Sequence, residues 1–440
     1  MTDLFEIVEE DVRGVRLRVF KNSPPSLRAV WLASAAHGDK DYLVYQDERY
    51  TFADAHRIVA SMARTLVEYG VQPGDRVAMA MRNYPEWAFA FWAAISAGAT
   101  TVPLNAWWTG PELAYGLSDS GAVVLFADEE RAERIAPHVG DTAVGHIVLA
   151  RTDRFMPNAE KFDDALGSLD SPALPDVEVG ADDDASIMYT SGTTGRPKGA
   201  VATHRNFVAH LMNGMYRAAA AAAAAPPAPD APAPLPMATL LTFPLFHVGG
   251  LQSFLMPYTA AGGKIVLMYK WDAAEAVDLI ERENVTAVAG VPTTVFQMLE
   301  VARAQGRELP SLAGVASGAT LVPPELVRRI DDQLASRAAP TNGYGLTETS
   351  GAAIANIGKS YLERPDSVGT PISPVMEVKI VDSDGNDAPA GEVGEIWLRG
   401  PTVVRGYFNN PEATSASFRD GWFLTGDLGR LDDEGYLYVV

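Results

Sequence analysis

Residues 50–104 alternate between helical and strand-like patterns, with only short turns between them. Apolar side chains recur at helical spacing from Phe52 to Tyr69, and Gly70 ends this helix. The expected elements are a helix over residues 52–69, a strand over 77–81, a helix over 85–97 and a strand over 100–104. Strands joined through a helix with short turns lie parallel, so this pattern predicts an α/β fold.

The same alternation returns between residues 275 and 334 and then stops. After about Asp366 the pattern changes to short strands, and Asp384-Gly385 is typical of a hairpin turn. We therefore expect two parallel-sheet α/β lobes followed by a small, β-barrel-like subdomain. The approximate ranges of these subdomains are residues 1–190, 191–345 and 346–440.

Composition excludes several classes of function. The 440 residues suggest about three structural units of ~150 residues. Lys and Arg number 35 against 56 Asp and Glu, and the net charge of −21 disfavours binding to nucleic acid. The chain has no cysteine, which excludes disulfides and thiolate nucleophiles. Its seven histidines form no zinc-binding pair.

The acidic N-terminus lacks the basic region and apolar run of a signal peptide. Residues 87–111 and 231–263 are long and uncharged, but glycine or proline interrupts both, so they are expected to be buried core. We expect a cytoplasmic protein without a transmembrane segment. Peripheral association with a membrane is left open, and the oligomeric state is unknown.

Eight consecutive alanines, residues 218–225, run into an Ala/Pro stretch that reaches Pro236. This composition predicts a short helix extension followed by an extended surface loop. A mobile linker or flap is the alternative.

Residues 189–199 (YTSGTTGRPKG) form the strongest local motif. Its glycines permit close backbone approach to a ligand, and its hydroxyls, N–H groups and lysine can donate to phosphate oxygens. It is not a Walker A motif, because Pro197 precedes the lysine and no GK[ST] follows the glycines in frame. We expect a phosphate-binding loop, with a Ser/Thr/Gly-rich surface turn as the alternative. The candidate residues are Thr190, Ser191, Gly192, Thr193, Thr194, Gly195 and Lys198.

Three later segments, in the same order, strengthen this interpretation. They are residues 342–349 (NGYGLTET), 394–414 (GEIWLRGPTVVRGYFNNPEAT) and 422–438 (WFLTGDLGRLDDEGYLY). Together with the loop, they resemble the acyl-adenylating superfamily, which includes AMP-forming acyl-CoA synthetases, firefly-type luciferases and peptide-synthetase adenylation domains. The resemblance covers almost the whole chain from about Thr51.

The resemblance implies an ATP site. Thr347 would approach the α-phosphate and Glu348 would bind Mg²⁺, and these two are the candidate catalytic residues. Tyr344 would face adenine and Asp427 would accept from the ribose hydroxyls. The other nucleotide-binding candidates are Gly318, Ala319, Asn342, Gly343 and Gly345. The alternatives are a surface helix cap for Glu348, ordinary packing for Tyr344 and a turn for Asp427.

Residues 243–250 (FPLFHVGG) resemble the acid-substrate segment of the same superfamily. No acidic residue lies between Asp230 and Asp272, so a substrate ammonium group would lack a partner. We therefore expect an acyl or aryl carboxylic acid, with His247 in the substrate channel. On its own, this histidine would more often be a core residue.

The reaction implied by the resemblance is attack of a carboxylate on ATP, giving acyl-AMP and pyrophosphate, followed in the full-length enzyme by transfer of the acyl group to CoA. A fatty or related acid is the favoured substrate. The alternatives are an acyl-AMP ligase that serves a carrier protein and a non-catalytic nucleotide or acyl sensor. Relatives continue into a mobile C-terminal domain, so we expect residues 1–440 to be the large domain alone, without its lid, and to adenylate poorly.

Overall fold

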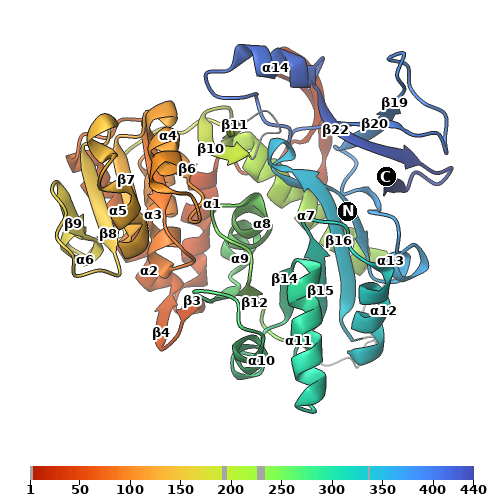
Figure 1. Ribbon diagram of the computed structural model, residues 1–440, viewed down its shortest axis with the longest axis horizontal. Coiled ribbons are helices and arrows are strands. Elements are labelled where there is room, and N and C mark those ends of the chain that lie inside the picture. The colour runs from red at the N-terminus through yellow and green to blue at the C-terminus, as the bar shows by residue number, and fades with distance from the viewer. Residues whose placement is uncertain (1–2, 191–195, 225–232, 335–336) are drawn as a thin grey trace.

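A seven-stranded sheet forms the first lobe of the computed structural model, which describes residues 3–190, 196–224, 233–334 and 337–440 (Figure 1). Six of its strands are parallel and the edge strand β11 is antiparallel to β10. In sheet order the strands are β11 (Lys198–Thr203), β10 (Asp184–Thr190), β6 (Thr100–Pro103), β5 (Arg76–Ala80), β7 (Val124–Asp128), β8 (His146–Ala150) and β9 (Ala159–Lys161). The predicted parallel strands at residues 77–81 and 100–104 are therefore confirmed.

The helices of this lobe begin where the sequence predicts. Helix α2 starts with a capping box between Thr51 and Asp54, and proline opens α3. The helices before and after these strands are α1 (Leu27–Ser34), α2 (Phe52–Glu68), α3 (Pro85–Ser96), α4 (Gly110–Ser120), α5 (Glu129–Ile135) and α6 (Phe162–Ala165).

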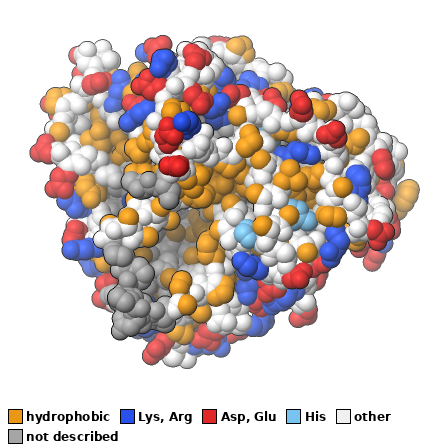
Figure 2. Space-filling model, turned by 180° about the vertical axis from the view of Figure 1, so that it is seen from behind, with side chains coloured by type: hydrophobic (Ala, Val, Ile, Leu, Met, Phe, Trp, Pro, Cys, Tyr) orange, Lys and Arg blue, Asp and Glu red, His pale blue; other side chains and the backbone are white. Residues whose placement is uncertain are grey.

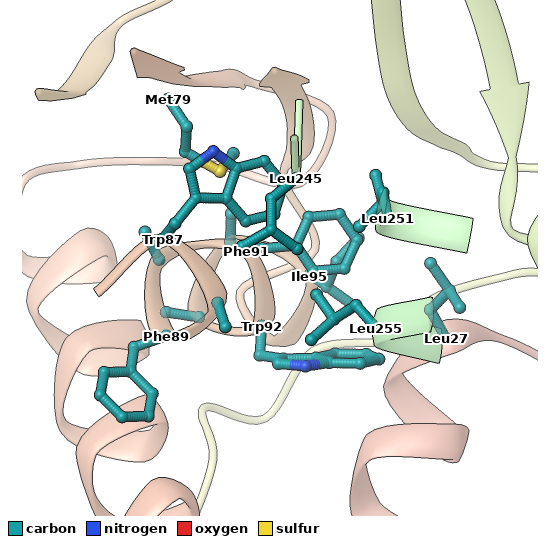
Figure 3. Packing of buried hydrophobic residues seen from close by; sticks show 14 of the residues in the cluster. Leu27, Met79, Trp87, Phe89, Phe91, Trp92, Ile95, Leu245, Leu251 and Leu255 are labelled. Carbon is teal, nitrogen blue, oxygen red and sulfur yellow. The ribbon is translucent and has the colours of Figure 1, made fainter. Parts of the chain in front are cut away.

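Helix α3 lies in the middle of the core and has almost no polar face. All its residues except Glu86 are buried, and the helix contacts β5 and β6 of the first sheet as well as β3 (Asp41–Tyr45) of the second. Figure 3 shows Trp87, Phe91 and Trp92 of α3 beside Leu245 and Leu255 from the second lobe. A helix that is apolar all round must be buried on all sides, so the uncharged stretch is core, as expected.

A nine-stranded sheet forms the second lobe, at the centre and right of Figure 1. Its six inner strands are parallel, and β4, β17 and β18 add antiparallel edges. In sheet order the strands are β18 (Thr370–Pro371), β17 (Gly351–Ile357), β16 (Ala339–Leu346), β15 (Gly314–Gly318), β14 (Ala287–Gly290), β12 (Ala238–Leu241), β13 (Lys264–Leu267), β3 (Asp41–Tyr45) and β4 (Glu48–Thr51). Its helices include α9 (Met256–Ala261), α10 (Ala273–Arg282), α11 (Pro292–Ala304), α12 (Pro324–Gln333) and α13 (Lys359–Glu363).

A small antiparallel sheet follows at the upper right of Figure 1. Its strands are β19 (Glu377–Val381), β20 (Gly394–Arg399), β21 (Phe418–Arg419), β22 (Trp422–Leu431) and β23 (Leu437–Val439), with α14 (Pro411–Ser417) between β20 and β21. The predicted turn is present, since Gly385 has φ +86° and Val381 pairs with Asp387 across it. Two parallel-sheet lobes and a β-rich part confirm the expected fold class.

The sheets do not follow chain order. Strands β3 and β4 belong to the second sheet although they precede the first, and β11 belongs to the first. A separate hairpin, β1 (Ile7–Val12) with β2 (Val15–Phe20), also lies outside both sheets. The division into residues 1–190, 191–345 and 346–440 remains a proposal. If strands were assigned to the sheet that they join, β3 and β4 would move to the second range and β11 to the first.

Helix α7 (His204–Ala224) includes most of the alanine run. The predicted helix extension is therefore present, and residues 225–232 lie outside the described part of the chain. In that described part, no helix is long and apolar enough to cross a membrane. On the face shown in Figure 2, apolar side chains gather toward the middle, and acidic and basic side chains surround them.

Candidate active site

Three of the segments predicted to form a site lie at one edge of the second sheet. Strands β12, β15 and β16 run in the same direction, so their carboxyl ends share that edge. Residues 243–250 follow β12, Gly318-Ala319 end β15, and residues 342–349 end β16. Ligands of open α/β sheets bind at this edge.

Strand pairing brings together candidate residues from two separate segments, Gly318-Ala319 and residues 342–349. Gly318 pairs with Gly343 in the parallel register of β15 and β16, and Asn342 beside them is buried. Ala319 adopts φ +62°, which turns the chain sharply after β15. Only glycine fits at position 345, because a Cβ on this residue would lie 2.0 Å from the carbonyl oxygen of Gly351.

The segment predicted to bind phosphate joins two antiparallel strands of the first sheet. Thr190 pairs with Lys198 across β10 and β11, and its hydroxyl donates to the Lys198 carbonyl oxygen at 3.4 Å. The loop candidates Ser191, Gly192, Thr193, Thr194 and Gly195 lie outside the described residues. Strand pairing thus fixes the positions of Thr190 and Lys198, the described candidates on either side of these residues.

Tyr344 and Asp427, two candidates 83 residues apart, are in direct contact. The Tyr344 hydroxyl donates to Asp427 Oδ2 at 2.7 Å. Burial raises the pKa of Tyr344 well above its usual range, and the hydrogen bond to the carboxylate raises it further. The phenol therefore remains a donor at every working pH. The second Asp427 oxygen is left to accept from a ligand.

Glu348 is buried, with 7% of its surface exposed, on the short helix η5 (Thr347–Thr349). Its Oε1 accepts a 2.7 Å hydrogen bond from the hydroxyl of Tyr407, and Lys198 Nζ lies 5.1 Å from the centre of the same ring. The structure thus brings Lys198 and Glu348 to one side chain. Tyr407 was missed as a candidate, although it lies within the motif 394–414, whose Gly-Tyr could have drawn attention to it.

His247 lies at the start of the short helix α8 (Val248–Gly250) and its side chain is exposed. Its Nδ1 accepts from the Gly249 N–H at 3.0 Å. A ring nitrogen that accepts must be unprotonated, so Nε2 carries the proton and can donate to a carboxylate. This arrangement fits a substrate-channel residue, a role that stays a prediction.

The residues present fit a magnesium ion bound together with phosphates. Among the described residues, no group of three or more His, Asp or Glu side chains could hold a metal ion. Mg²⁺ is usually held by one or two carboxylates together with substrate phosphates and water. Glu348 would supply one carboxylate, and Thr347 would add a hydroxyl from the same helix turn.

A cavity of about 120 Å³ lies beside the His247 segment. Arg82 spans it, with its guanidinium 5.3 Å from the ring centre of Trp107 and 5.2 Å from that of Tyr269. Trp107 is 57% exposed and contacts Phe246 edge to face. The rim also contains Lys270, so the cavity combines two cations with aromatic faces.

The fold and this arrangement of residues define an adenylate-forming enzyme. Residues 30–408 match the model of the family described as AMP-binding enzyme, and the chain belongs to this family. The class of enzyme expected from the sequence, an AMP-forming acid–CoA ligase that uses ATP and CoA, is thereby confirmed.

The chain is similar to several CoA ligases. The chain is 36% identical to a feruloyl-CoA synthase of an Amycolatopsis species over 390 residues, 89% of this chain and 73% of the relative. It is 33% identical to an indoleacetate–CoA ligase of Aromatoleum aromaticum over 404 residues, 91% of this chain and 75% of the relative.

Solved structures agree with this family. A fatty acyl CoA synthetase of Mycobacterium tuberculosis superposes with a TM-score of 0.80 and 28% identity, covering 94% of this chain and 78% of that one. The o-succinylbenzoate CoA synthetase of Bacillus subtilis, in complex with its acyl-adenylate intermediate, gives a TM-score of 0.74 at 28% identity, covering 94% and 77%.

Proposed function

We propose that this chain activates a carboxylic acid with ATP to acyl-AMP, releasing pyrophosphate, and that the acyl group is then transferred to the thiol of CoA. The observation that supports it most is the gathering of these groups at the carboxyl end of β16. Tyr344, bonded to Asp427, lies near the end of the strand, and Glu348, linked to Lys198 through Tyr407, lies in the helix η5 that follows it. We assign the first pair to the adenosine and the second to the phosphates of one ATP molecule.

In this proposal the protein's residues position the substrates and neutralise the charge of the phosphates, and they form no covalent bond with the substrates. The substrate carboxylate attacks the α-phosphorus and pyrophosphate leaves. Lys198 and the loop N–H groups offset negative charge on the phosphates, and the Thr347 hydroxyl donates to the α-phosphate. Glu348 would hold Mg²⁺, which supplies charge neutralisation of the phosphates when bound.

We propose an aromatic or arylalkyl acid as the substrate. Relatives act on feruloyl, indoleacetate and 4-coumarate groups. Aromatic rings lie in and just after the His247 segment. Phe243 stacks near Phe254, and Phe254 near Tyr258, with ring centres 6.5 and 6.2 Å apart. A fatty acid is the second candidate, supported by the likeness to the fatty acyl CoA synthetase.

For CoA we propose the cavity around Arg82. Cations between aromatic faces suit the phosphates and the adenine of this acceptor. Arg82→Ala and Lys270→Ala should weaken CoA binding several-fold, measured by calorimetry, without changing the affinity for ATP. An equal loss of ATP affinity would place the two residues in the adenylation site instead.

ATP–pyrophosphate exchange with a panel of acids tests the proposal. Ferulate, 4-coumarate, indoleacetate, octanoate and palmitate should separate the aromatic from the fatty candidate. Lys198→Ala and Glu348→Gln should weaken Mg·ATP binding, measured by calorimetry, without unfolding the chain. Exchange with no acid despite tight ATP binding would favour a nucleotide sensor, and acyl-AMP that reacts only with a carrier protein would favour the acyl-AMP ligase.

A further inference from the structure

Residues 401–408, here called the bridging segment, connect the β-rich part to both halves of the candidate site. The Val404 N–H donates to the Glu348 carbonyl oxygen at 2.9 Å. The Phe408 N–H donates to the Gly199 carbonyl oxygen at 2.7 Å, one residue after Lys198. The Asn206 amide of α7 donates to the carbonyl oxygens of Pro401 and Val403, which fixes the start of the segment.

Tyr407 is the side chain of this segment that reaches into the site. It is 8% exposed, and its hydroxyl donates to Glu348 Oε1 at 2.7 Å. Among the described residues, this phenol is the only hydrogen-bond donor to the Glu348 carboxylate. The ring of Tyr407 makes a second interaction, because Lys198 Nζ lies over its face, 5.1 Å from the ring centre.

The phenol of Tyr407 is protonated at neutral pH, because the ordinary pKa of a tyrosine is about 10. Its hydroxyl can therefore act as the donor in the hydrogen bond to Glu348. A donor to Oε1 orients the carboxylate and leaves Oε2 as the oxygen that can face a ligand.

We propose that Tyr407 is a positioning residue for the metal–nucleotide complex. Its hydroxyl sets the orientation in which Glu348 meets the metal ion of Mg·ATP, and its ring holds the Lys198 ammonium beside the phosphates. The proposal rests on the proposed function of Glu348 and Lys198. A partner that fixes a metal-binding carboxylate tunes affinity for the metal even though it makes no contact with it.

Two substitutions separate the two interactions. Tyr407→Phe keeps the ring under Lys198 and removes only the hydroxyl, whereas Tyr407→Leu removes both. The matched control is Tyr436→Phe, which loses a 2.9 Å hydroxyl contact with Ser360 elsewhere in the chain. Binding of ATP would be measured by calorimetry across a Mg²⁺ series and in EDTA, with urea unfolding to verify each fold.

We expect Tyr407→Phe to raise the Mg²⁺ concentration for half-maximal ATP binding about tenfold, as loss of a hydrogen bond to a charged group would. Its ATP affinity in EDTA should stay that of the wild type. Tyr407→Leu should show the same change in Mg²⁺ dependence and also bind ATP more weakly in EDTA. Tyr436→Phe should change neither quantity.

Two results would overturn the proposal. One is a wild-type Mg²⁺ dependence in Tyr407→Phe, or in Tyr407→Leu should the phenylalanine variant unfold. The other is an equal loss of ATP affinity with Mg²⁺ and with EDTA, which would assign Tyr407 a packing role only. By contrast, if ATP binding by the wild type does not respond to Mg²⁺, or Glu348→Gln leaves that response intact, the proposed function of Glu348 itself fails.

Discussion

Tyr344 and Asp427 are joined by a 2.7 Å hydrogen bond from the phenol to the carboxylate. The bond connects the end of β16 in the second lobe to β22 in the small sheet. It therefore makes one unit of two groups that the proposed function assigns to the same nucleoside. Asp427 Oδ2 is occupied by the phenol, so Oδ1 is the oxygen available to ribose.

Removing either partner of this bond should weaken ATP binding to different extents. We expect Asp427→Ala to weaken it about thirtyfold, because hydrogen bonds to a charged acceptor contribute roughly 1.5–3 kcal/mol. Tyr344→Phe should weaken ATP binding only about fivefold, since the carboxylate remains and loses only the hydrogen bond that orients it. Calorimetric titration with ATP measures both.

Tyr438 and Asp432 provide the control, because they form a similar 3.2 Å pair in the same sheet. Tyr438→Phe should bind ATP as the wild type does. If Tyr344→Phe also binds ATP normally, the bond to Asp427 serves only the packing of the two parts of the chain.

His204 should make the stability of the fold depend on pH. Its buried ring accepts from the Leu27 N–H at Nδ1, 3.2 Å away, and burial lowers its pKa from 6.5 to about 4. The folded-state pKa lies below that of the unfolded chain, so the unfolded chain binds more protons between these values. Stability is then full above pH 6.5 and decreases as the pH falls toward 4.

His204→Gln should therefore reduce the loss of stability between pH 7.5 and pH 5.5 by about 1 kcal/mol. The quantity to measure is the difference in the free energy of unfolding in urea at the two pH values, whatever the absolute stability of the variant. His146→Gln, at an exposed position, is the control. An unchanged pH difference in His204→Gln would show that this ring is not the group protonated on unfolding.

Gln252 is buried without compensation. It is fully buried on the π-helix η4 (Leu251–Leu255), and neither polar atom of its amide has a hydrogen-bond partner among the described residues. An unpaired buried polar group costs about 1–3 kcal/mol. Gln252→Met should therefore raise the free energy of unfolding by about 1 kcal/mol, measured from urea midpoints at constant m-value.

The matched control is Gln333→Met, because the Gln333 amide donates to the Leu299 carbonyl oxygen. That substitution should destabilise the fold. A loss of stability in Gln252→Met as well would mean that the Gln252 amide is satisfied in solution. A polar group kept at such a cost, on a distorted helix next to the His247 segment, is typical of a position retained for function.

The sequence predicts elements better than it predicts their neighbours. The helix–strand pattern of residues 50–104 is local, and the structure reproduces α2, β5, α3 and β6 within one or two residues. The placement of β3 beside β13 depends on a partner more than 200 residues later. No local periodicity contains that information, so the expected subdomain ranges and the sheets differ at their edges.

The candidate site shows the same division. The composition of residues 189–199 identified Lys198 as a candidate, whereas Tyr344, Glu348 and Asp427 follow from the resemblance of their segments to the adenylating superfamily. Tyr407 lies within the motif 394–414 but was not singled out, since a tyrosine before a phenylalanine normally indicates packing. Only the fold reveals that its hydroxyl meets Glu348, 59 residues away.

Asp128 and Arg131 form a buried ion pair at the start of α5, and breaking it should destabilise the first lobe. Both side chains are at least 96% buried; the carboxylate accepts from the guanidinium at 3.0 Å, from the Arg131 N–H and from the Arg82 N–H. Asp128→Leu leaves a buried cation without this partner, so we expect a loss of about 3 kcal/mol in urea unfolding.

The double variant Asp128→Leu/Arg131→Leu should recover part of that loss, because an apolar pair of similar size no longer buries a charge. Arg154→Ala, which breaks an exposed pair with Glu129, should change stability little. Equal losses in the single and double variants would show that the main contribution of Asp128 is to cap α5 and hold the Arg82 N–H. A recovery in the double variant would instead show that most of the loss comes from burying the Arg131 charge with only the partly exposed Glu130 left as its ion partner.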